Sequence, residues 1–238
     1  TDGDGIGDNA DKDDDGDGIE DSIDAAPYDS SVQYFNSVDV VGLIPDVLLR
    51  VCVEAIVANY ADAGEVETIY CSSAESSENA GPSIISLEGL QYFPNLKSLW
   101  LDSSEISSLE PLSGLISLEA LTVDNGQNTI SDLQPLNGLV NLKDLTIQNG
   151  SLTSEMLTPI TELPLLENLS LAFNNINDIS FLDNMSGDLK FLQIASNPVE
   201  DFSQIICFPA FAALTHHFLC SSTGTEIYTA SIFSFSNV

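Results

Sequence analysis

The most regular chemistry-bearing pattern in the sequence is a run of acidic residues near the N-terminus. If Asp13 is counted as position 1, acids stand at positions 1, 3, 5, 9 and 12, and Gly18 stands at position 6. This is the arrangement of a calcium-binding loop. Carboxylate oxygens without histidine or cysteine favour Ca²⁺ over transition metals. The predicted ligands are Asp13, Asp15, Asp17, the backbone carbonyl of Ile19, Asp21 and Asp24.

The same spacing occurs once more, 13 residues earlier in the chain. Position 1 of this copy would precede Thr1, so we expect the parent protein to continue upstream. Residues 1–30 hold 12 acids and few large apolar residues, so the alternative interpretation is a disordered acidic tail. The regular spacing argues against that alternative. The predicted ligands of this loop are Asp2, Asp4, the backbone carbonyl of Ile6, Asp8 and Asp11.

No helix-length apolar pattern flanks either loop, which excludes helix–loop–helix calcium sites. Residues 1–29 contain the tandem D-G-D-G-I-G-D-N-A-D-K-D-D-D-G-D-G-I-E-D-S-I-D, which resembles thrombospondin type-3 repeats. That resemblance implies a segment in which bound calcium replaces a hydrophobic core, with the nine aspartates above as ligands. Asp14 and Glu20 fall between the ligand positions, so we expect both to face solvent.

Charge and hydropathy limit the function classes open to the whole chain. It has 238 residues, 37 acids and 5 bases, and a formal net charge of −32. Nucleic-acid binding and docking on anionic lipid both need a basic surface, so both are excluded. No apolar run is long enough to span a membrane, which needs about 18 residues. A hydrophobic share of 43% supplies ample material for a core.

Leucines in the rest of the chain recur at a fixed period. The pattern L-x-x-L-x-L begins at residues 96, 118, 142, 166 and 189, with a partial copy at Val66. Spacings of 22, 24, 24 and 23 residues identify a solenoid of leucine-rich repeats. The predicted fold is therefore an α/β solenoid over residues 66–200, with short parallel strands on one side. The apolar spacing of three behind each strand predicts tight turns or 3₁₀ segments on the other side.

Two recurring phrases refine this fold prediction. The P-L-x-G-L phrases at Pro111–Leu115 and Pro135–Leu139, with the I-S-x-L openings, resemble bacterial internalin-like leucine-rich repeats over residues 84–200. The resemblance implies an extracellular or cell-surface location and a protein ligand. Asn174 and Asn197 stand where such repeats place an inward asparagine, whereas Ser104, Gly126 and Gly150 replace it elsewhere.

Both ends of the solenoid need caps, because a terminal coil has no neighbour to cover its leucines. Residues 30–65 are predicted to hold a linker and a capping helix that begins at Pro45 and Asp46. Residues 201–238 are predicted to form the C-terminal cap and tail. The predicted inward face of this helix consists of Leu48, Cys52, Ala55 and Ile56. The predicted disulfides are Cys52–Cys71 and Cys207–Cys220.

The alternative for the cysteines is four buried thiols. Calcium loops together with paired cysteines at the caps favour an oxidising compartment. A zinc site is disfavoured, because there is no C-x-x-C motif and the two histidines, His216 and His217, are adjacent.

The sequence contains no catalytic motif, so we expect a binding protein rather than an enzyme. Between the inward leucines, the intervening strand residues face outward on the expected concave side. Exposed aromatics beside acids are typical binding anchors, although Trp100 could instead pack on Tyr70 only to stiffen the sheet. The candidate partner-binding residues are Tyr70, Trp100, Asp102, Thr122, Asp124, Asp144 and Thr146.

These residues leave three functional hypotheses open. The first is an extracellular binding or adhesion module on a calcium-stiffened segment, with a neutral or basic polypeptide as its partner. The second is a structural spacer, and the third is a non-catalytic domain of a larger secreted protein or enzyme. We expect a monomer.

Overall fold

The computed structural model describes residues 11–17, 19–22, 24–31, 34–72, 83–102, 104–124, 126–186 and 189–201. Most of the first predicted calcium loop (Asp2, Asp4, Ile6 and Asp8), Gly18 and the Cys207–Cys220 pair lie outside these residues, as does nearly all of the predicted C-terminal cap.

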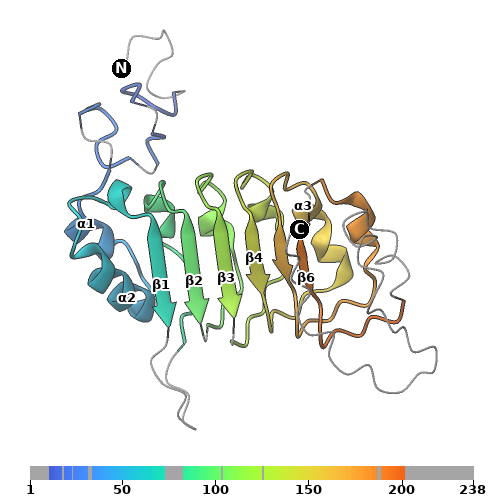
Figure 1. Cartoon of the computed structure of the whole chain (residues 1–238). Coiled ribbons are helices and arrows are strands. Elements are labelled where there is room, and N and C mark those ends of the chain that lie inside the picture. The colour runs from blue at the N-terminus through green and yellow to red at the C-terminus, as the bar shows by residue number, and fades with distance from the viewer. Residues whose placement is uncertain are drawn as a thin grey trace, which may run out of the picture.

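Six short strands form one parallel sheet in the order β1-β2-β3-β4-β5-β6 (Figure 1). Each inward leucine or isoleucine pairs with its equivalent in the next strand, and this column is 0–3% exposed from Ile69 to Leu192. The predicted leucine-rich repeat solenoid is therefore confirmed. The strands are β1 (Thr68–Ser72), β2 (Ser98–Asp102), β3 (Ala120–Asp124), β4 (Asp144–Ile147), β5 (Asn168–Ser170) and β6 (Phe191–Gln193).

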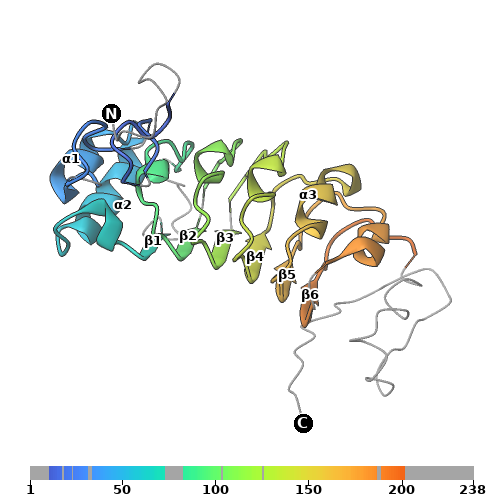
Figure 2. The ribbon, with the colours of Figure 1, turned by 90° about the horizontal axis from the view of Figure 1, so that it is seen from above.

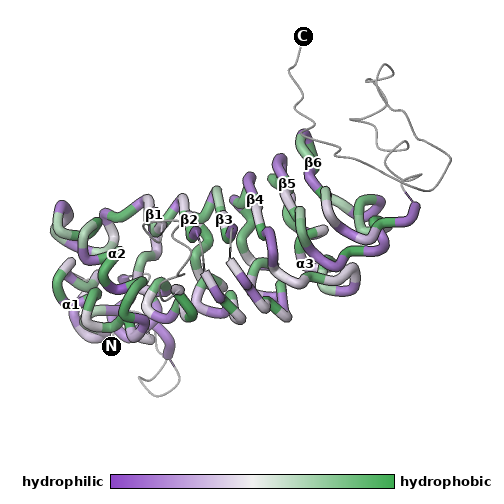
Figure 3. Tube along the Cα trace, turned by 90° about the horizontal axis from the view of Figure 1, so that it is seen from below, coloured by the Kyte–Doolittle hydropathy of each residue, from purple (hydrophilic) through white to green (hydrophobic). Residues whose placement is uncertain are grey.

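The side of the solenoid behind the strands is built from 3₁₀ segments and one short helix, as Figure 2 shows from above. In Figure 3, hydrophobic and hydrophilic stretches alternate within each coil, as expected for a chain that turns leucines inward once per strand and again behind it. These elements are η1 (Ala63–Glu65), η2 (Leu90–Tyr92), η3 (Glu110–Leu112), η4 (Gln134–Leu136), η5 (Ser154–Leu157), α3 (Thr158–Thr161) and η6 (Ser180–Asn184).

Two helices, α1 (Ser37–Gly42) and α2 (Val47–Val57), cover the N-terminal end of the solenoid (Figure 1). Asp46 caps α2 by accepting hydrogen bonds from the backbone N–H groups of Leu48 and Leu49 at 2.9 and 3.0 Å. Its other carboxylate oxygen accepts from Ile85 N–H at 2.9 Å. One carboxylate therefore starts the helix and ties it to the second coil.

The predicted inward face of this helix is partly wrong. The buried residues are Leu49, Val53 and Val57, whereas Ala55 is exposed and Cys52 is half-buried. The reason is that α2 is apolar around most of its circumference, with Arg50 and Glu54 as its only charged residues. Hydrophobic spacing alone therefore defines no single face.

The inward asparagine ladder is more complete than the sequence indicates. Asn128, which is 1% exposed, accepts hydrogen bonds from Ile106 N–H at 2.8 Å and from Ser104 Oγ at 3.1 Å. Asn128 therefore supplies the inward hydrogen-bonding side chain that Gly126 lacks. A Cβ on Gly126 would lie 1.7 Å from the Ser104 carbonyl oxygen, so only glycine fits there.

None of the helices in the described residues is long and apolar enough to cross a bilayer.

Candidate functional site

The outward face of the sheet carries the candidate partner-binding residues in three columns. The strand register pairs Tyr70 with Trp100 and Trp100 with Thr122, and two steps further along the strands it pairs Asp102 with Asp124. Thr146 continues the first of these columns, and Asp144 lies in a third column beside Ala120. All seven predicted residues therefore lie on one face, and they come from β1 to β4.

The aromatic residues form a pair at one end of this face. Tyr70 is 52% exposed and Trp100 is 47% exposed, although both are large and apolar. Their ring centroids lie 5.1 Å apart with an interplanar angle of 69°, which is an edge-to-face contact. The two rings thus hold each other in place while they leave about half of their surface to solvent.

The opposite end of the same face, over β4 to β6, is closed by its own hydrogen bonds. Gln148 Nε2 donates to Ser170 Oγ at 3.0 Å, and Ser170 Oγ donates to Gln193 Oε1 at 2.8 Å. Ser170 is 5% exposed as a result. The aromatic and acidic half of the face, over β1 to β3, is therefore the half that offers a ligand both apolar area and charge.

A ladder of alternating charge runs along the starts of the strands, and sequence reasoning missed it. Its members stand two residues before each inward leucine or isoleucine, so comparing that single position across the repeats would have revealed it. Three ion pairs result, with N–O distances of 2.6, 2.6 and 2.7 Å. Glu67 pairs with Lys97, Glu119 with Lys143, and Glu167 with Lys190.

Electrostatics within the ladder favour the charged forms of its members. The hydrogen bond from Lys143 and its positive charge lower the pKa of the Glu119 carboxyl below its usual range. The same contact raises the pKa of Lys143. Since the ladder uses three of the chain's five bases on its own glutamates, Asp102 and Asp124 at the other margin leave the face acidic. Asp144, the third candidate acid on this face, accepts a hydrogen bond from the side chain of Asn168.

The second predicted calcium loop brings three of its ligands together. Carboxylate oxygens of Asp13, Asp15 and Asp17 lie within 4.8 Å of one another. Backbone N–H groups fix two of the carboxylates, since Gly16 donates to Asp13 Oδ1 at 3.0 Å and Ile19 donates to Asp17 Oδ1 at 2.9 Å. Gly16 has a φ of +73°, a left-handed conformation that suits glycine and lets the loop turn.

Asp24, the predicted ligand at position 12, is 5% exposed. Its Oδ1 accepts from Ala26 N–H at 2.9 Å, and its Oδ2 is buried with no hydrogen-bond partner among the described residues. Asp15 Oδ2 is also buried with no hydrogen-bond partner among the described residues. Burial and the negative charges of Asp17, Asp15 and Asp21 raise the pKa of Asp24. Buried, unbonded oxygens among like charges are what a hard divalent cation would satisfy, so the residues present fit calcium.

Two expectations for the acids between the ligand positions have different outcomes. Glu20 does face solvent, with a 59% exposed side chain that lies 3.7 Å from Lys12. The expectation that Asp14 faces solvent is wrong, because Asp14 is 2% exposed. Its backbone N–H donates to Asp21 Oδ1 at 2.9 Å, and this contact folds the loop over it.

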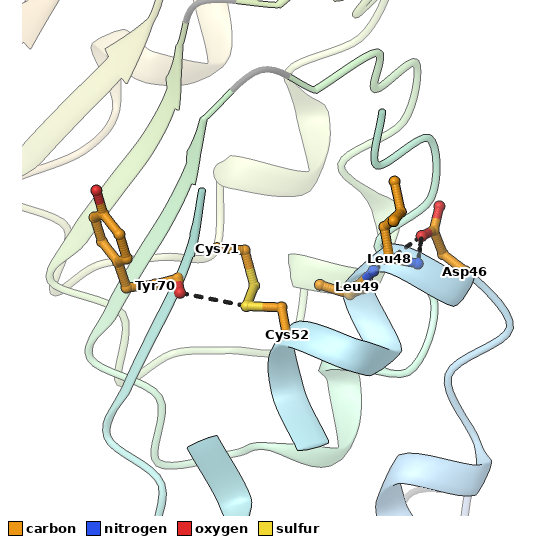
Figure 4. Close-up of a disulfide and its surroundings, with 6 residues drawn as sticks. All are labelled: Asp46, Leu48, Leu49, Cys52, Tyr70 and Cys71. Atoms are coloured by element: carbon orange, nitrogen blue, oxygen red, sulfur yellow. Dashed lines mark hydrogen bonds between the residues drawn. A yellow bond between two sulfur atoms is a disulfide. The ribbon is translucent and has the colours of Figure 1, made fainter. Parts of the chain in front are cut away.

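The predicted Cys52–Cys71 disulfide is present and joins α2 to β1 (Figure 4). The Cα atoms of the two cysteines are 5.7 Å apart, and Cys71 is 2% exposed. Cys52 Sγ also lies 3.3 Å from the Tyr70 carbonyl oxygen. A disulfide sulfur carries no proton, so this is a packing contact rather than a true hydrogen bond.

Comparison with solved structures bears on the fold. The chain is similar to internalin C2 of Listeria monocytogenes at 24% sequence identity and a TM-score of 0.52, over 72% of this chain and 83% of that one. The chain has a leucine-rich repeat fold of the internalin kind. An internalin of the same species, InlF, matches at 21% identity with a TM-score of 0.35, over 72% and 68% of the two chains. A leucine-rich repeat protein of Leptospira interrogans matches at 21% identity with a TM-score of 0.46, over 51% and 31%.

No protein-family model and no curated protein sequence matches the chain.

Proposed function

We propose that this chain is an extracellular protein-binding module without catalytic activity, and that the outward face of β1 to β3 is its binding surface. The observation that carries this proposal is the Tyr70–Trp100 pair, whose side chains are 52% and 47% exposed and are the most exposed large apolar side chains of the six strands. Exposed aromatics of this kind dominate the energy of protein interfaces. Side chains that served only to stiffen the sheet could be smaller and more polar than Tyr70 and Trp100.

The shape and charge of the face favour a polypeptide partner. Strands about 4.8 Å apart give six strands a span of roughly 24 Å, which suits an extended peptide or the edge of a protein better than a small metabolite. Asp102 and Asp124 stand beside the aromatic pair, and the chain's net charge is −32. A neutral or basic segment is therefore the expected ligand, and electrostatic attraction would speed its approach.

A panel of purified extracellular protein domains, screened against immobilised full chain, tests this function. Trp100→Ala should lose binding to any domain that the wild type retains. The matched control is Ile116→Ala, because Ile116 is 59% exposed but lies in the turn before β3, outside the outward columns. Partners that bind wild type and Trp100→Ala equally would contradict the proposed surface.

Calcium would stiffen the segment that precedes the solenoid. When bound, the ion would neutralise the crowded carboxylates, with Asp13, Asp15, Asp17 and Asp24 holding it. Phe35, which follows this segment in the chain, contacts the start of the solenoid: Ala63 N–H donates to the Phe35 carbonyl oxygen at 2.8 Å, and the rings of Phe35 and Tyr92 lie 5.1 Å apart.

Isothermal titration with CaCl₂ and small-angle scattering test this role. We expect calcium to compact the N-terminal segment, and Asp24→Asn to weaken calcium binding. Glu20→Gln is the control, since that side chain is exposed and falls between the ligand positions. A scattering curve that calcium leaves unchanged would contradict the stiffening role. Calcium and a disulfide also support an oxidising, extracellular location.

A further inference from the structure

We infer that the Cys52–Cys71 disulfide is a redox-sensitive clamp that positions Tyr70 against Trp100, so that a thiol reductant weakens the binding face. The inference rests on the proposed function for its biological meaning. It rests on geometry for its mechanism, because the covalent tie lies one residue from the exposed ring.

The position of β1 in the sheet makes it dependent on the cap. It is the first strand in the order β1 to β6, so it forms ladder hydrogen bonds with β2 alone. Its opposite flank meets α2, where Cys52 Sγ is bonded to Cys71 Sγ and touches the Tyr70 carbonyl oxygen at 3.3 Å. Figure 4 shows the Tyr70 side chain on the side of β1 away from this disulfide. The bond therefore holds the backbone from which the ring projects.

Reduction would cut this tie and leave the rest of the cap in place. A dithiol attacks Cys52 Sγ, which belongs to the half-buried cysteine. The S–S bond breaks, Cys71 leaves as a thiolate and takes up a proton, and the second thiol of the reductant completes its own disulfide while Cys52 regains a proton. Leu49, Val53 and Val57 remain at most 2% exposed in the core. The helix thus stays packed, while β1, which pairs with β2 alone, loses its covalent tie to the cap.

Trp100 is the only tryptophan in the chain, so its fluorescence reports on the aromatic pair without any partner. The protein used is the full chain carrying Cys207→Ala and Cys220→Ala, which leaves Cys52–Cys71 as its one possible disulfide. Dithiothreitol should shift the Trp100 emission to the red and reduce the near-ultraviolet circular dichroism of the Tyr70–Trp100 pair. Amide exchange at β3 to β5 should stay slow, which shows that the repeats remain folded.

A second variant, Cys52→Ala with Cys71→Ala, should show the shifted emission at once and no further change with dithiothreitol. The inference is overturned if this variant or the reduced protein keeps the wild-type emission and dichroism. It is also overturned if β3 to β5 lose their protection together with β1, because the disulfide would then support the whole solenoid. If the spectra change as expected but no domain binds the wild-type chain, the clamp stands and the proposed function fails.

Discussion

Replacing Asn174 by alanine should destabilise the solenoid more than any other single ladder substitution. Asn174 Oδ1 accepts from Gly150 N–H and Leu152 N–H, both at 3.0 Å, and it is 6% exposed. Its Nδ2 donates to the carbonyls of Ile147, Leu171 and Ala172 at 2.9, 3.0 and 3.2 Å. One side chain therefore links two consecutive coils through five hydrogen bonds.

The cost depends on which of these partners have a second hydrogen bond. Leu171 O also accepts from Asn197 Nδ2 at 2.8 Å, and Ala172 O also accepts from Asn149 N–H at 3.4 Å. Gly150 N–H and Leu152 N–H lose their acceptor, and Ile147 O loses a donor. At about 1–3 kcal/mol for each buried group left unsatisfied, the loss is about 4 kcal/mol.

Asn128→Ala is the matched comparison. It removes the acceptor of Ile106 N–H and of the buried Ser104 Oγ, but it also removes Asn128 Nδ2, a buried donor without a hydrogen-bond partner among the described residues. The net cost should be smaller, about 1 kcal/mol. Thermal unfolding followed by far-ultraviolet circular dichroism should place Asn174→Ala roughly 12 °C below wild type and Asn128→Ala only a few degrees below. Equal losses would refute these roles in the asparagine ladder.

Three further predictions concern the calcium segment, the cap disulfide and the charge ladder. Calcium chelation should expose residues 11–31 to limited proteolysis while β2 to β6 resist, and Asp15→Asn should mimic chelation whereas Glu20→Gln should not; a segment equally resistant with and without calcium would contradict this. Loss of the Cys52–Cys71 disulfide, which closes a sequence separation of 19 residues, should lower the free energy of unfolding by about 3 kcal/mol in urea titrations, and an unchanged midpoint would argue that the cap is held by packing alone. Lys143 lowers the pKa of Glu119, so the ion pair stabilises the fold fully at pH values above the ordinary pKa of a glutamate, and this stabilisation is lost as the pH falls through the lowered pKa. Lys143→Met should therefore raise the Glu119 pKa in a carboxyl NMR titration. An unchanged Glu119 pKa would mean that the pair is not formed in solution.

The repeat architecture was predictable because its signal is redundant. Leucines at a fixed period must all be buried, and the inward column from Ile69 to Leu192 satisfies that requirement strand by strand. The same reasoning placed Tyr70 and Trp100 side by side, because stacked coils bring equivalent positions into register. Hydrophobic periodicity does not identify the buried face of a helix that is apolar on several sides, and the predicted inward face of α2 is partly wrong for that reason.

Other features depend on contacts between coils rather than on composition. Asn128 lies two residues after the expected ladder position, and only the turn of the chain at Gly126 brings it to Ser104. Asp14 is buried because its own backbone N–H reaches Asp21, which loop spacing does not reveal. The charge ladder is visible in the sequence when one position is compared across the repeats, and the structure adds the three ion pairs that its members form.

Hydroxyl-radical footprinting of the full chain with a partner from the domain panel tests the proposed binding face most directly. Oxidation of Tyr70 and Trp100 should fall when the partner is bound. Oxidation of Ile116 and Val140, which are 59% and 50% exposed in the turns before β3 and β4, should stay unchanged. Trp100→Ala should weaken the same complex by about 2 kcal/mol, roughly 30-fold in Kd. A bound complex in which Tyr70 and Trp100 oxidise as fast as in the free chain would contradict the proposed binding face.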